Sequence, residues 1–138
     1  MRGVAKLLLE LGEQPLQVIA SPLVRAVQTA EIVAVVTRLG DRQGKVQVRR
    51  ELSPGGGGGA GLVASLASAG AKRVMLVGHE PDMSELTSTL VSKGSPNPFE
   101  KAMVVGLQLG PSGDNCRLRF VLDPKSHRLD PDLRGSGP

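Results

Sequence analysis

Apolar and polar positions along the chain predict strands that alternate with helices. Residues 74–77 form an uncharged apolar run that stops at Gly78-His79 and then meets Pro81. An apolar run between two turn signals is typical of a strand buried on both faces of a parallel sheet. His79 is therefore expected just past the carboxyl end of a central strand, at the edge where open α/β sheets bind ligands.

The rest of the pattern repeats this alternation. Apolar residues at helical spacing predict helices over residues 1–12, 22–40, 61–68 and 83–90. Short β-favouring runs predict strands over residues 16–20, 46–48, 103–109 and 117–122. This order predicts an α/β fold: a mostly parallel sheet with helices on both faces and a C-terminal antiparallel hairpin. A helix at the very start should itself follow a strand, so the pattern lacks one central β-element.

A second chemical candidate follows the strand at residues 16–20. Ser21 is expected to cap the next helix, with Pro22 at its first position. Arg25 then falls in the first helical turn, beyond the carboxyl end of its strand as His79 is. An arginine and a histidine that meet helix N-terminal N–H groups form a pocket suited to a dianion, and a phosphoryl group is the natural occupant.

Length and composition narrow the class of protein. A chain of 138 residues is expected to form one domain, here residues 1–124, followed by a disordered tail at 125–138 rich in Pro, Gly, Asp and Arg. No stretch approaches a membrane span or a signal peptide. A single cysteine, Cys116, suits a reducing compartment and predicts a cytoplasmic protein with no disulfide.

Charge and aromatic content limit the ligands. The net charge of +4 favours anionic ligands. Nucleic acid is not expected, because the chain has no Trp or Tyr and only Phe99 and Phe120 to stack on bases. One cysteine and two distant histidines predict no metal and no cofactor. The glycines at 55–59 lack a Gly-Lys-Ser/Thr ending, so they predict a flexible loop and not a phosphate loop.

Two motifs resemble those of the histidine phosphatase superfamily, and within it the small SixA-type phosphohistidine phosphatases. The family's arginine motif is matched by Ser21-Pro-x-x-Arg25-Ala26-x-Gln28-Thr29-Ala30, and its second histidine motif by Gly78-His79-Glu80-Pro81. The resemblance covers about residues 1–124. It implies a phosphoglycerate-mutase-like fold in which Arg25, His79 and Ser21 bind the phosphoryl group.

The chain departs from this family at one point. Family members open with a central strand that ends in Arg-His-Gly, whose histidine is the nucleophile. This sequence contains no Arg-His-Gly, and its two histidines are His79 and His127. His127 is expected in the tail, with no strand to hold it. We therefore expect the chain to begin inside the first helix, through a misplaced start or a truncation. A degenerate homologue is the other explanation.

The resemblance implies a mechanism and a substrate. In an intact member the missing histidine attacks phosphorus, while Arg25, His79 and the missing arginine stabilise the transition state. Glu51 and Glu80 are candidates for a general acid, although the SixA-type group is thought to manage without one. The implied partner is a phosphohistidine-bearing protein or a small phosphoester. The alternative is a phosphate-binding pseudoenzyme or interaction domain; the oligomeric state stays open.

Overall fold

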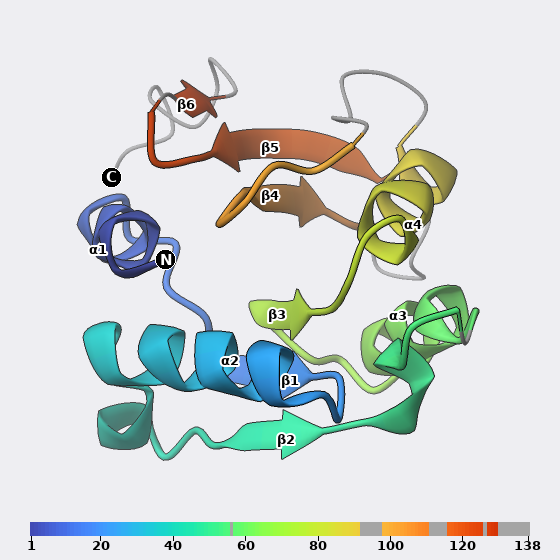
Figure 1. Cartoon of the computed structure of the whole chain (residues 1–138), viewed down its shortest axis with the longest axis horizontal. Coiled ribbons are helices and arrows are strands. Elements are labelled where there is room, and N and C mark those ends of the chain that lie inside the picture. The colour runs from blue at the N-terminus through green and yellow to red at the C-terminus, as the bar shows by residue number, and fades with distance from the viewer. Residues whose placement is uncertain (56, 92–97, 111–115, 126, 130–138) are drawn as a thin grey trace.

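The computed structural model describes residues 1–55, 57–91, 98–110, 116–125 and 127–129 (Figure 1). In chain order the elements are α1 Arg2–Glu10, β1 Gln17–Ala20, α2 Val24–Val36, the 3₁₀ turn η1 Leu39–Arg42, β2 Val46–Val48, the 3₁₀ turn η2 Arg50–Leu52, α3 Gly59–Ser68, β3 Val74–Val77, α4 Asp82–Leu90, β4 Val104–Gln108, β5 Arg117–Leu122 and β6 His127–Leu129. The predicted α/β fold with a C-terminal antiparallel hairpin is confirmed.

The parallel part is a three-stranded sheet in the order β2-β1-β3. β1 lies in the centre and pairs in parallel with both neighbours, with Ala20 opposite Val48 on one side and Val77 on the other. Val18, Ile19 and Ala20 are fully buried, because α2 packs beside β1 and the side chains of α3 reach its other face. β1 therefore holds the central position in this sheet.

The position of β3 corrects one prediction. The apolar run at residues 74–77 does form a strand, but β3 is an edge strand of this sheet and not a central one. Of its four residues only Val77 is buried, and the other three are partly exposed. The physical reason is that, within the described residues, no strand pairs with the free side of β3.

The C-terminal strands form a separate antiparallel sheet in the order β4-β5-β6. β6 corrects the prediction of a structureless tail, because residues 127–129 pair with β5, with Phe120 opposite Leu129. The same pairing supplies a strand for His127, which the sequence analysis had not expected. Residues 126 and 130–138, the rest of the predicted tail, lie outside the described residues.

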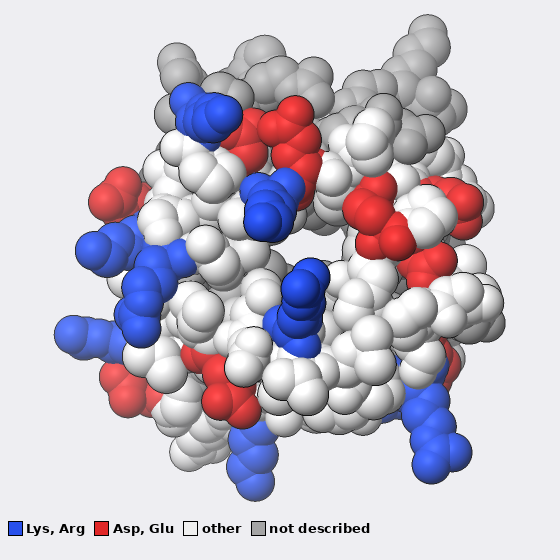
Figure 2. Space-filling view, in the orientation of Figure 1, with Lys and Arg blue, Asp and Glu red and all other residues white. Residues whose placement is uncertain are grey.

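An opening separates the two sheets. β3 and β4 are both edge strands, and neither pairs with the other. The space-filling view shows a passage through the molecule between them, with Lys and Arg side chains to its upper left and below it and Asp and Glu side chains to its right (Figure 2). The arrows of β3 and β4 run in the same direction (Figure 1). The unpaired edges of the two sheets therefore face the same gap and run parallel to each other.

Helix α1 connects the two sheets at one end of this gap. Its Val4 and Leu8 pack against Phe120 and Leu122 of β5, while Ala5 packs into the core beneath α2. Just after the helix, Glu13 forms a two-pronged ion pair with Arg119 of β5, with both N–O distances at 3.1 Å. Both residues are largely shielded from water, which favours this geometry over that of an open surface pair.

The two leucines at positions 8 and 9 give a matched test of this connection. Leu8 is 2% exposed and Leu9 is 40% exposed on the same helix. We expect Leu8→Ala to lower the free energy of unfolding by about 2–5 kcal/mol, since it leaves a cavity against β5. Leu9→Ala should change it by less than about 0.5 kcal/mol. Urea unfolding measures both, and equal losses would show that α1 does not join the sheets through Leu8.

Candidate functional site

The carboxyl ends of the three parallel strands bring the site residues to one edge of the sheet. The backbone ladder continues past the strands: Ser21 N–H donates to Val77 O, and Arg49 N–H donates to Ala20 O, both at 2.9 Å. The chain after β1, β2 and β3 thus delivers Ser21, Arg49 and His79 to the same rim. Ligands bind at this rim in open α/β sheets.

Ser21 and His79 are in direct contact at this rim. Ser21 Oγ lies 2.6 Å from His79 Nε2, within hydrogen-bond distance. The serine side chain is fully buried, and its Oγ also accepts the N–H of Leu23 at 3.2 Å. The imidazole ring is half-buried. Ser21 therefore lies behind the histidine and holds one of its two ring nitrogens.

This placement changes two predictions about Ser21. α2 begins at Val24 with Leu23 as its N-cap, so Ser21 is not the capping residue. Direct contact between Ser21 and a phosphoryl group does not fit either, because a side chain with no exposed surface cannot reach a ligand in solvent. The Oγ that would cap the helix is used to bind His79 and the N–H of Leu23 instead.

Arg25 is exposed in the first turn of α2, as predicted. Among the described residues its guanidinium forms no hydrogen bond and no ion pair. Its donors are therefore unoccupied in this part of the chain, and the guanidinium fork has a geometry that matches phosphate oxygens. The structure places Arg25 and His79 after adjacent strands at the same edge, but it does not bring their side chains into contact.

The amino end of α4 does not provide the expected anion cradle. Met83 N–H donates to His79 O, and Ser84 N–H donates to Glu80 Oε1, both at 2.9 Å. The first free N–H groups of a helix bind anions only when they have no other partner. Here the chain itself satisfies the N–H groups of Met83 and Ser84, so these two groups order the His79 segment and are not free for a ligand.

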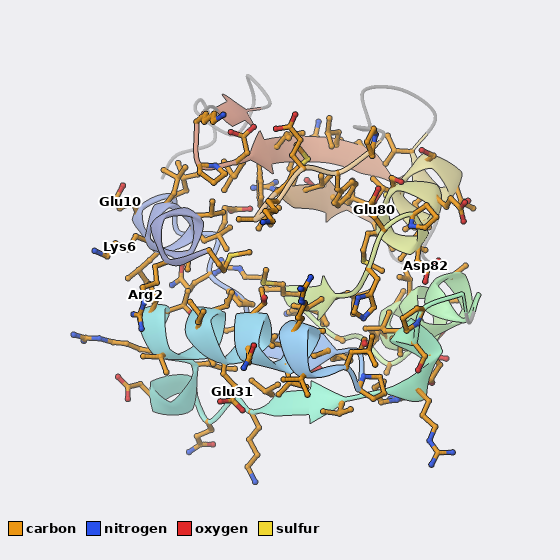
Figure 3. The ribbon with its side chains drawn as sticks, viewed as in Figure 1. Arg2, Lys6, Glu10, Glu31, Glu80 and Asp82 are labelled. Atoms are coloured by element: carbon orange, nitrogen blue, oxygen red, sulfur yellow. The ribbon has the colours of Figure 1, made fainter. Side chains whose placement is uncertain are left out.

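Glu80 is a structural residue in this arrangement. Its carboxylate accepts hydrogen bonds from Ser84 N, from Ser84 Oγ at 2.9 Å and from Phe99 N at 3.1 Å. Figure 3 shows Glu80 and Asp82 near α4, whereas Arg2, Lys6 and Glu10 lie on the outer side of α1. With its two oxygens occupied, Glu80 ties residue 99 to the start of α4 and is a poor candidate for a general acid.

Glu51 is bound by an arginine that the sequence analysis missed. Arg49 donates to both carboxylate oxygens of Glu51. This side-chain hydrogen bond is the main reason that the pKa of Glu51 lies below its ordinary value, and a backbone hydrogen bond adds to it. A carboxylate that is held ionised is a poor proton donor at neutral pH. The sequence signal for Arg49 was its place directly after the strand at 46–48.

The glycine segment is attached to this side of the rim. Gly55 N–H donates to Asp82 Oδ2 at 2.8 Å, which links the segment to α4. A Cβ at Gly58 would lie about 3 Å from the backbone of Glu51, so only glycine fits there. Between α3 and α4 lies a pocket of about 180 Å³, whose lining includes Glu51, Asp82 and Glu85. Its carboxylates make it unsuited to a phosphoryl group.

Gly78 allows the close packing beneath His79. A Cβ at this position would lie 2.6 Å from the terminal carbon of Met83, closer than real Cβ contacts come. The missing side chain lets Met83 fold back under the strand end. The turn from β3 into α4 can therefore be tight, and His79 is held close to Ser21.

Three further features of the described residues bear on the site. No helix among them is long and apolar enough to cross a membrane. They contain no group of three or more His, Cys, Asp or Glu side chains placed to bind a metal ion. Burial raises the pKa of the Cys116 thiol, which leaves little reactive thiolate at neutral pH.

The overall arrangement matches known phosphatases. The structure of the protein histidine phosphatase SixA in complex with tungstate superposes with a TM-score of 0.78 and 26% sequence identity, covering 89% of this chain and 78% of that one. The chain belongs to the histidine phosphatase superfamily. A second match, a mycobacterial glucosyl-3-phosphoglycerate phosphatase with bound VO₃, shares the fold with a TM-score of 0.60 at 19% identity. It covers 85% of this chain and 82% of that one.

The chain also has a relative in sequence. An uncharacterized protein from Picosynechococcus sp. is 36% identical over 111 residues, which is 78% of this chain. The chain spans 65% of the length of that relative. No protein-family model matches the chain. The assignment to the histidine phosphatase superfamily therefore rests on the structural match and on the two motifs at its rim.

The pair formed by Arg49 and Glu51 gives a testable property of this superfamily member. We expect the Glu51 carboxyl to titrate below its ordinary range, since Arg49 stabilises the ionised form. Arg49→Ala should raise the pKa of Glu51, whereas Arg50→Ala, which removes an exposed neighbouring charge, should leave it nearly unchanged. Carbon-detected NMR titration of the carboxyl measures both.

The lowered pKa of Glu51 also determines how the stability of the fold depends on pH. Because the folded-state pKa is lowered, the pair contributes stability above the unfolded-state pKa and loses it as the pH falls through the folded-state pKa. A Glu51 titration that Arg49→Ala leaves unmoved would show that the contact between the two side chains does not form in solution.

Proposed function

We propose that the chain carries the phosphoryl-binding part of a phosphohistidine phosphatase of the SixA type. The observation that carries this proposal is the placement of His79, held by Ser21, on the same rim as Arg25. The structure of SixA contains tungstate, a tetrahedral oxyanion that can stand in for phosphate. The net charge of +4 favours an anionic ligand, and Lys and Arg side chains lie on one side of the opening (Figure 2).

In this proposal Arg25 and His79 bind the non-bridging oxygens of the phosphoryl group. Their donors stabilise the charge that these oxygens carry as phosphorus passes from one nitrogen to another. The nucleophilic histidine attacks phosphorus, the P–N bond to the substrate imidazole breaks, and water then hydrolyses the phosphoenzyme. Imidazole departs readily from a phosphoramidate. A dedicated acid is therefore not needed, in keeping with the occupied carboxylates of Glu51 and Glu80.

The proposed position of the nucleophile is a strand between β3 and β4. These two edges run in the same direction across the opening, so one parallel strand can pair with both of them (Figure 1). A strand there would end beside His79, because its neighbour β3 ends there. His127 is a poor substitute, since β6 lies on the far side of β5 from this gap. An Arg-His-Gly strand would meet this requirement.

The rival proposal is a phosphate-binding pseudoenzyme or interaction domain. One observation favours it: the 138 residues contain no Arg-His-Gly, although Arg25 and His79 are both present. Such a protein would bind the phosphoryl group of a partner without hydrolysing it. The two proposals share an anion site and differ in turnover, so activity and binding have to be measured separately.

We expect the 138-residue chain to release no phosphate above background from a phosphohistidine-bearing protein. An extended version, in which a β-strand ending in Arg-His-Gly precedes α1, should release it, and His79→Ala in that version should slow release by about 10²–10³-fold. The matched control carries Arg-Ala-Gly on the same strand. Robust turnover by the 138-residue chain itself would require another nucleophile, while an inactive but folded extended version would favour the pseudoenzyme.

Anion binding is tested by removing the arginine at the rim. Arg25→Ala should weaken tungstate binding about tenfold or more, since charge-assisted hydrogen bonds contribute about 1.5–3 kcal/mol. Lys72→Ala is the control, because it removes an exposed charge of the same sign at the opposite end of β3. Isothermal titration calorimetry compares the three proteins. Equal weakening by both variants would mean that net charge, and not the Arg25 fork, drives binding.

A further inference from the structure

Ser21 has a property that capping and core packing do not explain. It is fully buried and lies 58 residues before His79, yet its Oγ is 2.6 Å from His79 Nε2. Its backbone is fixed by the hydrogen bond from Ser21 N–H to Val77 O, which extends the β1–β3 ladder by one residue. A hydroxyl placed this rigidly against one ring nitrogen can determine which nitrogen carries the proton.

We propose that Ser21 is a positioning residue that donates to Nε2 of His79 and so holds the neutral ring in the Nδ1–H tautomer. The functional consequence rests on the proposed phosphoryl site: Nδ1–H is then the donor that the histidine presents to an oxyanion at the rim. The tautomer itself follows from the geometry around Ser21 and does not depend on that site.

The donors and acceptors at Ser21 Oγ decide which ring nitrogen carries the proton. A hydroxyl has one hydrogen and two lone pairs. Leu23 N–H takes one lone pair at 3.2 Å. If Nε2–H donated to the second, the serine hydrogen would point into a fully buried space where the described residues offer it no other acceptor. Buried donors left without a partner are strongly disfavoured. If the hydroxyl donates to Nε2 instead, the serine hydrogen and Nε2 both have a partner.

The other ring nitrogen is available for a ligand. The ring is half-buried, and within the described part of the chain no protein group bonds Nδ1 of His79. With Nε2 committed as an acceptor, the ring hydrogen lies on Nδ1 and faces away from Ser21. A ring without such a partner exchanges between its two tautomers, and only one of them presents a donor at a given position. Ser21 thus fixes the tautomer of the ring before a ligand binds.

The chain is well suited to a direct test, because it has two histidines. Two-bond ¹⁵N–¹H correlation spectra of the full chain, labelled with ¹⁵N-histidine, distinguish the Nδ1–H and Nε2–H tautomers at about pH 8.5, above the usual histidine pKa of ~6.5. His127→Gln assigns the signals. We expect His79 to show the Nδ1–H pattern, and Ser21→Ala to shift it towards Nε2–H or an averaged pattern.

Ser84→Ala is the matched control. Ser84 is also buried, at 1% exposed, but its Oγ bonds Glu80 and not His79, so the His79 pattern should stay unchanged. Ser21→Thr keeps the hydroxyl and should keep the Nδ1–H pattern. Amide spectra show whether each variant folds, and the pattern of the unmodified chain decides the question if Ser21→Ala does not. An Nε2–H pattern in the unmodified chain, or no change in folded Ser21→Ala, would overturn the proposal.

Tungstate binding tests the tautomer of His79 and the proposed phosphoryl site separately. Adding it should move the Nδ1 signal of His79, and Ser21→Ala should bind it about two- to tenfold more weakly, as expected for one misaligned hydrogen bond. If tungstate does not bind at all, the phosphoryl site fails while the tautomer result still stands. If it binds Ser21→Ala as tightly as the unmodified chain, Ser21 holds the ring but does not prepare it for the anion.

Discussion

The parallel register between β1 and β3 is the constraint on which the candidate site depends. Because Ala20 lies opposite Val77, the next residues on both strands leave the sheet together, and the bond from Ser21 N–H to Val77 O holds them there. A shift of one residue would turn the side chains to the other face and separate Ser21 from His79. The backbone ladder therefore sets a contact between side chains that lie 58 positions apart.

Around this contact the chain uses its other polar groups for structure. Glu80 closes the start of α4, Asp82 holds Gly55, and Glu51 is held ionised by Arg49. These bonds occupy the carboxylates of Glu80, Asp82 and Glu51, whereas no described residue binds the guanidinium of Arg25 or Nδ1 of His79. The chemistry proposed for these two groups is the binding of an oxyanion, and the structure of SixA holds one, tungstate.

Local signals in the sequence predicted most of the elements and two of the rim residues. The apolar run ending at His79 and the position of Arg25 after a strand are local patterns, so they could be recognised without the fold. The role of Ser21 could not be predicted, because its Oγ binds a local partner, Leu23 N–H, and also His79, whose contact depends on the fold. The edge position of β3 and the pairing of residues 127–129 depend on which strands meet, and composition does not encode that.

Helix α1 packs against both sheets, so the size of its side chains bears on the width of the gap between them. Its two faces touch different cores, with Ala5 against the parallel sheet and Val4 and Leu8 against β5. The sizes of the side chains on these two faces affect how far apart the helix holds the two sheets. Substitutions in α1 can therefore move the edges of β3 and β4 apart or together while the rim residues stay intact. Sequence divergence in this helix could thus tune the geometry of the superfamily site from a distance.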